Sequence, residues 1–238
     1  MTTTTTTQPS SPLTRTGSSA GLQRGAGIAA LVKAATYLVG FGVIGAYLAP
    51  RGLLDAQGDP AASLQFLLDN QTVLYAWYLV LYLVGGIALV SLVLGVRDRL
   101  HGASALARTA EVFGHIWAGL LLASGMVHLI GQQAVVALAA DDSTTAATVW
   151  TSVGVVQDAL GGGVELVGAV WVLLVSLAAL RTRTFSLGLA GLGLAVGVAG
   201  VWTLLPAAAD VAASLFGLGF VAWFVWTGVS LLRAPRQG

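Results

Sequence analysis

Apolar residues along this chain occur in long runs separated by short polar segments, and not in alternating patterns. A membrane-spanning helix needs about 20 mostly apolar residues, and six stretches of the sequence meet that requirement. The runs lack the two-residue alternation of a membrane β-barrel. The pattern therefore predicts an all-α, polytopic membrane protein, a six-transmembrane-helix bundle. The predicted spans lie near residues 27–49, 73–96, 109–138, 149–180, 185–205 and 209–232.

The segments outside the spans divide the chain into a membrane domain and two tails. Residues 1–24 are predicted to be a disordered tail, because Thr, Ser, Pro and Gly dominate and too few apolar residues are available to offset chain entropy. The six-helix domain then covers 25–233, and 234–238 form a second short tail.

The segment from Pro50 to Gln71 is predicted to contain a short extracytoplasmic helix. Asp59 followed by Pro60 is typical of a helix N-cap and first helical position. Leu64, Leu67 and Leu68 would share one face of that helix. An irregular loop is the alternative.

Composition excludes several classes of function. Hydrophobic residues make up 56% of the 238 positions and charged residues 9%, against roughly 25% charged in a soluble domain. Cysteine is absent, which excludes disulfides, thiolate metal sites and cysteine nucleophiles. A formal net charge of +1 gives no electrostatic footprint for nucleic acid. The lipid bilayer is the predicted partner, and no cofactor is indicated.

The basic residues predict the orientation in the membrane. With six spans, nine arginines fall on one side and only Arg51 on the other, while five aspartates occupy the opposite loops. Because basic residues favour the cytoplasm, both termini are predicted to be cytoplasmic. Ten Arg against one Lys, with abundant Ala, Gly and Val, is typical of a GC-rich bacterial genome and so of the bacterial inner membrane. The arginines are Arg15, Arg24, Arg97, Arg99, Arg108, Arg181, Arg183, Arg233 and Arg236; the aspartates are Asp55, Asp59, Asp69, Asp141 and Asp142.

Six ionisable residues fall at membrane depth, where charges are costly and often mark function. They form the set of polar-interior candidates. The set is Lys33 in the first span, Glu111, His115 and His128 in the third, and Asp158 and Glu165 in the fourth.

The fourth span has the clearest pattern, since both of its carboxylates share a narrow strip with several glycines. On a continuous helix, Asp158 and Glu165 fall within a stripe of roughly 120° that must face protein. The run Gly161-Gly162-Gly163 also weakens the helix, which would allow local unwinding as in the broken helices of transporters. Close packing of a neighbouring helix is the alternative role for the glycines. Glu165 is placed near the midplane, within reach of the long Lys33 side chain.

The third span has polar residues in two groups. Glu111 and His115 can pair at i, i+4, and Ser124, His128 and Gln132 recur every four residues nearer the other end. His115 and His128 are about 20 Å apart along the helix, so they cannot bind one metal together. A pair of His128 and Asp158 supplies two ligands where zinc usually has three or four. No metal site, and no motif of a nucleophilic enzyme, is therefore predicted.

The order of these features resembles a known family. A first span is followed by Arg51-Gly52, by Gly58-Asp59-Pro60-Ala61-Ala62 and by a leucine-rich outer helix. A second span, a basic loop and a polar third span come next. The chain thereby resembles the bacterial six-span membrane domain-of-unknown-function family 4386. The resemblance implies a six-helix fold and a bacterial inner-membrane location, and it brings no activity or catalytic residues.

Two functions from different classes are compatible with this sequence. The first hypothesis is that the protein moves or senses a small solute or a proton through an interior lined by Lys33, His128, Asp158 and Glu165. The alternative is a non-catalytic packing or assembly subunit that binds another membrane protein or a second copy of itself. A hydrated cavity touching Glu165 would favour the first. A dry interior with a small-residue face open to lipid would favour the second. An intramembrane enzyme or cofactor binder is the least favoured class.

Overall fold

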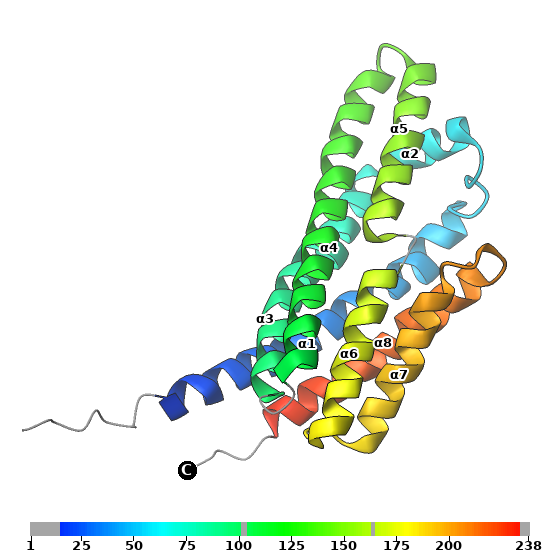
Figure 1. Cartoon of the computed structure of the whole chain (residues 1–238). Coiled ribbons are helices and arrows are strands. Elements are labelled where there is room, and N and C mark those ends of the chain that lie inside the picture. The colour runs from blue at the N-terminus through cyan, green and yellow to red at the C-terminus, as the bar shows by residue number, and fades with distance from the viewer. Residues whose placement is uncertain (1–14, 101–103, 163–164, 234–238) are drawn as a thin grey trace, which may run out of the picture.

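The computed structural model describes residues 15–100, 104–162 and 165–233, and every regular element within these ranges is helical (Figure 1). Five apolar helical segments are long enough to cross a membrane, which indicates a multi-pass membrane protein. A further apolar helix is shorter, with 16 residues. The all-α class is thus confirmed. The five long segments are Ala20–Arg51, Pro60–Arg99, Ala105–Ala139, Ser143–Thr182 and Pro206–Leu232.

Eight α-helices and several tighter or wider turns build the described part of the chain. The α-helices are α1 (Arg15–Val43), α2 (Pro60–Tyr78), α3 (Gly85–Arg99), α4 (Ser104–Ala139), α5 (Ser143–Gln157), α6 (Leu166–Thr182), α7 (Leu187–Trp202) and α8 (Ala209–Leu232). Three π-helical turns, η2 (Ile44–Leu48), η4 (Leu79–Val84) and η5 (Asp158–Gly162), follow α1, α2 and α5. Two 3-10 turns are η3 (Ala49–Arg51) and η6 (Pro206–Ala208).

The first helix begins earlier than the hydrophobic pattern predicts. α1 starts at Arg15 and not near residue 27, so the expected disordered tail is wrong for Arg15–Arg24. Contacts with α3 explain part of this extension, because the Gln23 amide donates to the Gly95 carbonyl at 3.0 Å and to Asp98 Oδ2 at 2.6 Å. Residues 1–14 and the expected tail at 234–238 lie outside the described residues.

The cap at Asp59 is confirmed, but the helix that it starts is not a separate element. The Asp59 carboxylate accepts from the Ala61 and Ala62 amides at 2.9 and 3.3 Å. The helix then continues into the second long segment through a kink at Asn70, where φ is −125° and ψ is 21°. Leu64 and Leu67 are buried, as their shared face predicts. The expected short helix is therefore the first part of α2.

A second aspartate cap begins α5. Asp142 accepts hydrogen bonds from the Thr145 amide at 3.0 Å and the Thr145 hydroxyl at 2.6 Å. These hydrogen bonds stabilise the ionised form, so they lower the pKa of the Asp142 carboxyl below its ordinary value.

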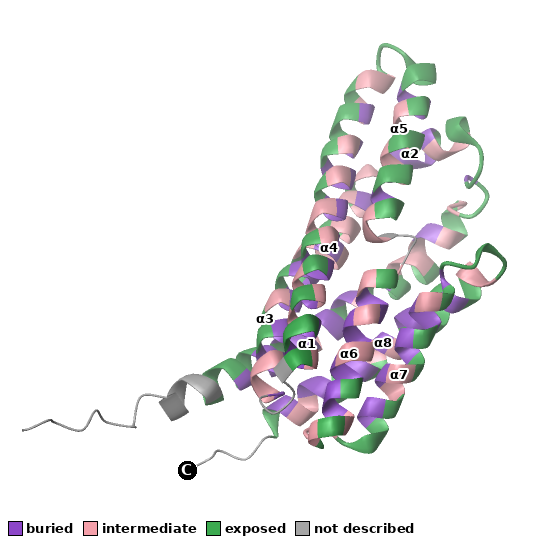
Figure 2. Ribbon diagram, viewed as in Figure 1, coloured by how far each residue is buried: buried purple, intermediate pink, exposed green. Residues whose placement is uncertain are grey.

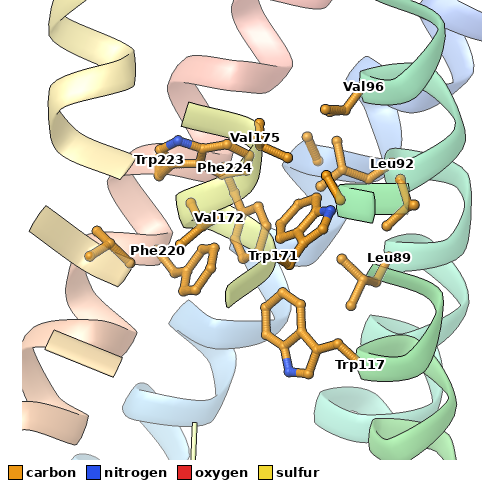
Figure 3. Close-up of a cluster of buried hydrophobic side chains, with 14 of the residues drawn as sticks. Leu89, Leu92, Val96, Trp117, Trp171, Val172, Val175, Phe220, Trp223 and Phe224 are labelled. Atoms are coloured by element: carbon orange, nitrogen blue, oxygen red, sulfur yellow. The ribbon is translucent and has the colours of Figure 1, made fainter. Parts of the chain in front are cut away.

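Buried side chains form two apolar cores. Figure 2 marks the buried residues along the helices. The large core joins α1, α3, α4, α6, α7 and α8, and its centre is aromatic: Trp117, Trp171, Phe220, Trp223 and Phe224 pack together (Figure 3). The small core joins η2, α2, α5 and the last turns of α4 around Leu48, Leu67 and Val135. The irregular turns η4 and η5 fall where the chain passes from one core to the other.

Charge distinguishes the two ends of the bundle. The start of α1, the end of α3, the end of α6 and the end of α8 lie at one end, here called the basic end (Figure 1). Arg24, Arg99, Arg181 and Arg233 occupy those helix ends. The opposite, acidic end contains the connections with Asp55, Asp59, Asp141 and Asp142. The segregation read from the sequence is thus present in the fold.

Candidate functional site

A cavity of about 210 Å³ lies between the two cores. It is lined by residues from α1, η2, α2, η4, α4, η5 and α8 and by Glu165, the residue before α6. Lys33 and Glu165 supply its opposite charges. The wall consists of Lys33, Tyr37, Gly40, Phe41, Ile44, Trp77, Leu81, Tyr82, Leu121, Gly161, Glu165, Ala213 and Gly217.

One face of the first helix forms a long wall of the cavity. Lys33, Tyr37, Gly40 and Ile44 recur at intervals of four, three and four residues, which is the repeat of a single helix face. At 1.5 Å per residue, this wall is about 16 Å long. The polar residues therefore lie at one end of the wall and the apolar Ile44 at the other.

All three π-helical turns contribute to the wall. Ile44 belongs to η2, Leu81 and Tyr82 belong to η4, and Gly161 belongs to η5. A π-helical turn widens the local hydrogen-bonding pattern and is frequent at functional sites. Their convergence means that three helices depart from regular geometry around the same space.

Lys33 is held inside the protein with 1% of its surface exposed. Its ammonium nitrogen lies 4.7 Å from the ring centre of Tyr37 and 6.0 Å from that of Trp117, so two aromatic faces support the positive charge. Gly85 provides the space, because a Cβ at that position would lie 2.9 Å from the ammonium nitrogen. The aliphatic stem and the charge are thus both enclosed by neighbouring helices.

Glu165 occupies the N-cap of α6, where the helix dipole favours a negative charge. Its backbone N–H donates to the Thr203 hydroxyl at 3.2 Å, which links the start of α6 to the end of α7. The side chain is half-buried. Lys33 and Glu165 are close enough for their charges to attract each other, but no ion pair within 4.0 Å joins these two described side chains.

The fourth predicted span is broken at its glycines. Gly161 has φ of 140° and ψ of 21°, a conformation that favours glycine. Local unwinding, one of the two roles considered for the glycines, is therefore present at Gly161, while the single continuous stripe containing Asp158 and Glu165 is wrong. Asp158 is exposed and does not line the cavity, whereas Glu165 does. The break separates two carboxylates that a regular helix would place together.

Beside the cavity, a network of uncharged polar groups centres on Gln157, which is 4% exposed. Its amide accepts from the Tyr78 hydroxyl at 3.3 Å and donates to the Tyr82 hydroxyl at 3.0 Å and to Ser124 Oγ at 3.2 Å. Ser124 in turn donates to the Gln157 carbonyl at 3.0 Å. These hydrogen bonds connect Gln157, the last residue of α5, to α2, η4 and α4.

His128 borders this network but contributes no side-chain hydrogen bond to it. Its ring stacks on Tyr78, with ring centres 3.2 Å apart, and lies edge-on to Trp150 at 5.0 Å. The His128 Nε2 atom is buried with no hydrogen-bond partner among the described residues, and so is Gln132 Oε1 one turn away. His128 and Asp158 therefore both lie outside the cavity wall.

The remaining two candidates lie toward the basic end, far along α4 from the cavity. Glu111 forms an ion pair with Arg97 at 3.4 Å, which joins α4 to α3. His115 Nδ1 lies 2.9 Å from the Glu111 backbone oxygen and does not pair with its carboxylate. Both residues therefore have local structural contacts. Within the described residues, no group of three or more His, Asp or Glu side chains is arranged to hold a metal ion.

A search of the sequence for ionisable residues alone misses several residues that form the site. Gln157, Tyr78 and Tyr82 are uncharged, and so are Tyr37 and Trp77 in the cavity wall. Trp77 is notable because its Nε1 atom is buried and has no hydrogen-bond partner among the described residues. A search for hydroxyl, amide and indole groups inside apolar runs would have found these positions, although not their partners.

Comparisons with protein-family models, with curated proteins and with solved structures find no match to this chain. The resemblance to the six-span bacterial family therefore stays a prediction.

Proposed function

We propose that this chain is a six-span protein of the bacterial inner membrane that moves or senses a small solute or a proton through the cavity between its two cores. The observation that supports the proposal is the cavity itself, whose wall contains both Lys33 and Glu165 beside a broken helix. Ionisable groups inside a membrane protein are costly and commonly mark solute and proton pathways. A broken helix whose N-terminus points at the site is a recurrent feature of transporters.

The six-span arrangement adds α7 to the five long segments. In chain order α7 is then the fifth crossing and α8 the sixth. The 16 residues of α7 are about 24 Å long, somewhat less than the roughly 30 Å of a bilayer core. Local thinning of the bilayer accommodates such a span at modest cost. With α7 included, both termini fall on the side of the basic end, which the preference of arginine for the cytoplasm places inside the cell. The first part of α2 is then the extracytoplasmic helix.

Reconstitution of the purified chain into liposomes tests movement directly. A trapped pH-sensitive dye reports proton flux after an external acid step, and light scattering after an osmotic step reports solute permeation. We expect flux above that of empty liposomes, and we expect Glu165→Gln to abolish it because the amide keeps the shape and loses the charge and the titration. Asp210→Asn is the matched control, since Asp210 is an exposed acid in the first turn of α8 outside the cavity wall.

A protein that senses gives no flux, so the same variants are also tested by chemical accessibility. The native chain lacks cysteine, and Ala213→Cys places one thiol at an exposed position of the cavity wall. A sensor would show thiol reactivity that changes with pH and loses that change in Glu165→Gln. Absence of both flux and this change would overturn the proposal and favour the assembly subunit.

A further inference from the structure

We infer that the cavity binds a small zwitterion, a solute with one carboxylate and one alkylated ammonium group. This inference rests on the proposed function, because it names the class of solute that the cavity accepts. The structural basis is that the cavity presents one positive and one negative side chain that do not neutralise each other by direct contact.

The charges define the two ends of the ligand. Lys33 and Glu165 line the same cavity, yet no ion pair within 4.0 Å joins them. An enclosed charge without a partner is costly, so a ligand that complements both charges gains more than one that complements a single charge. The Lys33 ammonium matches a carboxylate, and the Glu165 carboxylate matches a cation. A zwitterion satisfies both and adds no net charge to the interior.

The wall near Glu165 favours an alkylated ammonium over a primary one. A primary ammonium has three N–H donors that each need an acceptor, and most of the remaining wall is apolar, as at Phe41, Leu81 and Leu121. An alkylated ammonium has few or no N–H groups to satisfy. It is instead stabilised by a carboxylate and by aromatic faces, and Tyr37, Phe41 and Tyr82 line this cavity.

Size limits the ligand to a small molecule. A volume of about 210 Å³ is below the roughly 300–1,000 Å³ of pockets that hold drug-sized ligands. Glycine betaine, which has a trimethylammonium group and a carboxylate on one carbon, is of this size and serves as the probe. The exposed Phe41 and Ala213 form the part of the wall that is open to the surroundings.

Equilibrium binding of radiolabelled glycine betaine to the purified full-length chain tests the inference. We expect saturable binding that unlabelled glycine betaine displaces. Choline, which lacks the carboxylate, and 3,3-dimethylbutyrate, which replaces the ammonium by carbon, should each displace the label at least ten-fold less well. Lys33→Met should weaken binding at least ten-fold. Asp210→Asn should bind like the native chain.

The results separate this inference from the proposed function. Displacement by choline or 3,3-dimethylbutyrate as effective as by glycine betaine would overturn it, as would unchanged affinity in Lys33→Met or no saturable binding. If binding is absent while Glu165-dependent proton flux persists, only the ligand class is wrong. If glycine betaine binds as expected but neither flux nor a pH-dependent change is found, the ligand class stands and the proposed function fails.

Discussion

Lys33 and Glu165 show how a charge is retained inside an apolar bundle without a direct partner. Aromatic rings from Tyr37 and Trp117 face the ammonium group, and the helix dipole of α6 favours the carboxylate. Removal of one partner from a buried pair in direct contact costs about 3–5 kcal/mol. Since this pair is separated, the coupling between the two charges should be smaller.

At these two positions we therefore expect Glu165→Gln to lower the free energy of unfolding by about 1–2 kcal/mol, because Lys33 loses the attraction of the opposite charge. Lys33→Met added to Glu165→Gln should recover much of that loss. Thermal unfolding of the two single variants and the double variant in detergent gives the coupling free energy of the cycle. A double variant whose loss equals the sum of the two single losses would show that the charges are independent.

Gln157 offers a second test at the scale of single residues. Gln157→Leu keeps a similar volume but leaves the Tyr78, Tyr82 and Ser124 hydroxyls without their amide partner. Hydrogen bonds between membrane helices contribute about 0.6–2 kcal/mol each, so we expect a loss of about 1–3 kcal/mol. Gln133→Leu is the matched control, since Gln133 is exposed on α4 and should show little change. Equal melting temperatures for the two variants would exclude a structural role for the Gln157 network.

Elements were predictable from the sequence where local chemistry determines them. The Asp59 cap, the limits of α8 and the weak point at the glycines of the fourth span all follow from residue type and spacing. The π-helical turns were not predictable, because η4 and η5 arise where the chain passes from one core to the other, which depends on tertiary packing. The early start of α1 also depends on tertiary contact, as the hydrogen bonds of Gln23 to α3 show. Lys33 and Glu165 could be chosen as ionisable residues inside apolar runs, but Glu165 lies level with the end of α7 and not at its middle. Asp158 was misplaced because the break rotates it out of the stripe.

Helix packing through glycine gives a prediction at the scale of elements. A methyl group at Gly95 on α3 would overlap the Ala26 methyl on α1, so Gly95→Ala must push these helices apart. Overpacking of this kind costs about 1–3 kcal/mol. Gly119→Ala is the matched control, because nothing lies within 4 Å of a Cβ there and helix propensity favours alanine by up to about 1 kcal/mol. The comparison is made by thermal unfolding of both variants in detergent. A Gly95→Ala protein as stable as Gly119→Ala would contradict the close α1–α3 contact.

The whole molecule combines two cores with a charge asymmetry between its ends. The large core contains the short α6 and α7, while the small core continues along α4 and α5 toward the acidic end (Figure 1). Glu165 is linked to Thr203 at the end of α7, so it is level with that end of the short helices. The cavity therefore lies on the side of the small core that faces the basic end, next to the start of α6 and the end of α7.

This arrangement predicts which parts of the chain face the outside of the cell. Single cysteines at Ser63 in α2 and at Ser143, the first residue of α5, lie at the acidic end, and one at Ser186, before α7, lies at the basic end. Because the native chain has no cysteine, each variant carries one reactive thiol. In whole cells, a membrane-impermeant reagent should label the first two and spare Ser186→Cys, which should react only after the membrane is permeabilised. Labelling of Ser186→Cys alone would reverse the orientation. Labelling of all three in intact cells would mean an even number of crossings between Ser143 and Ser186, because these two positions would then face the same side.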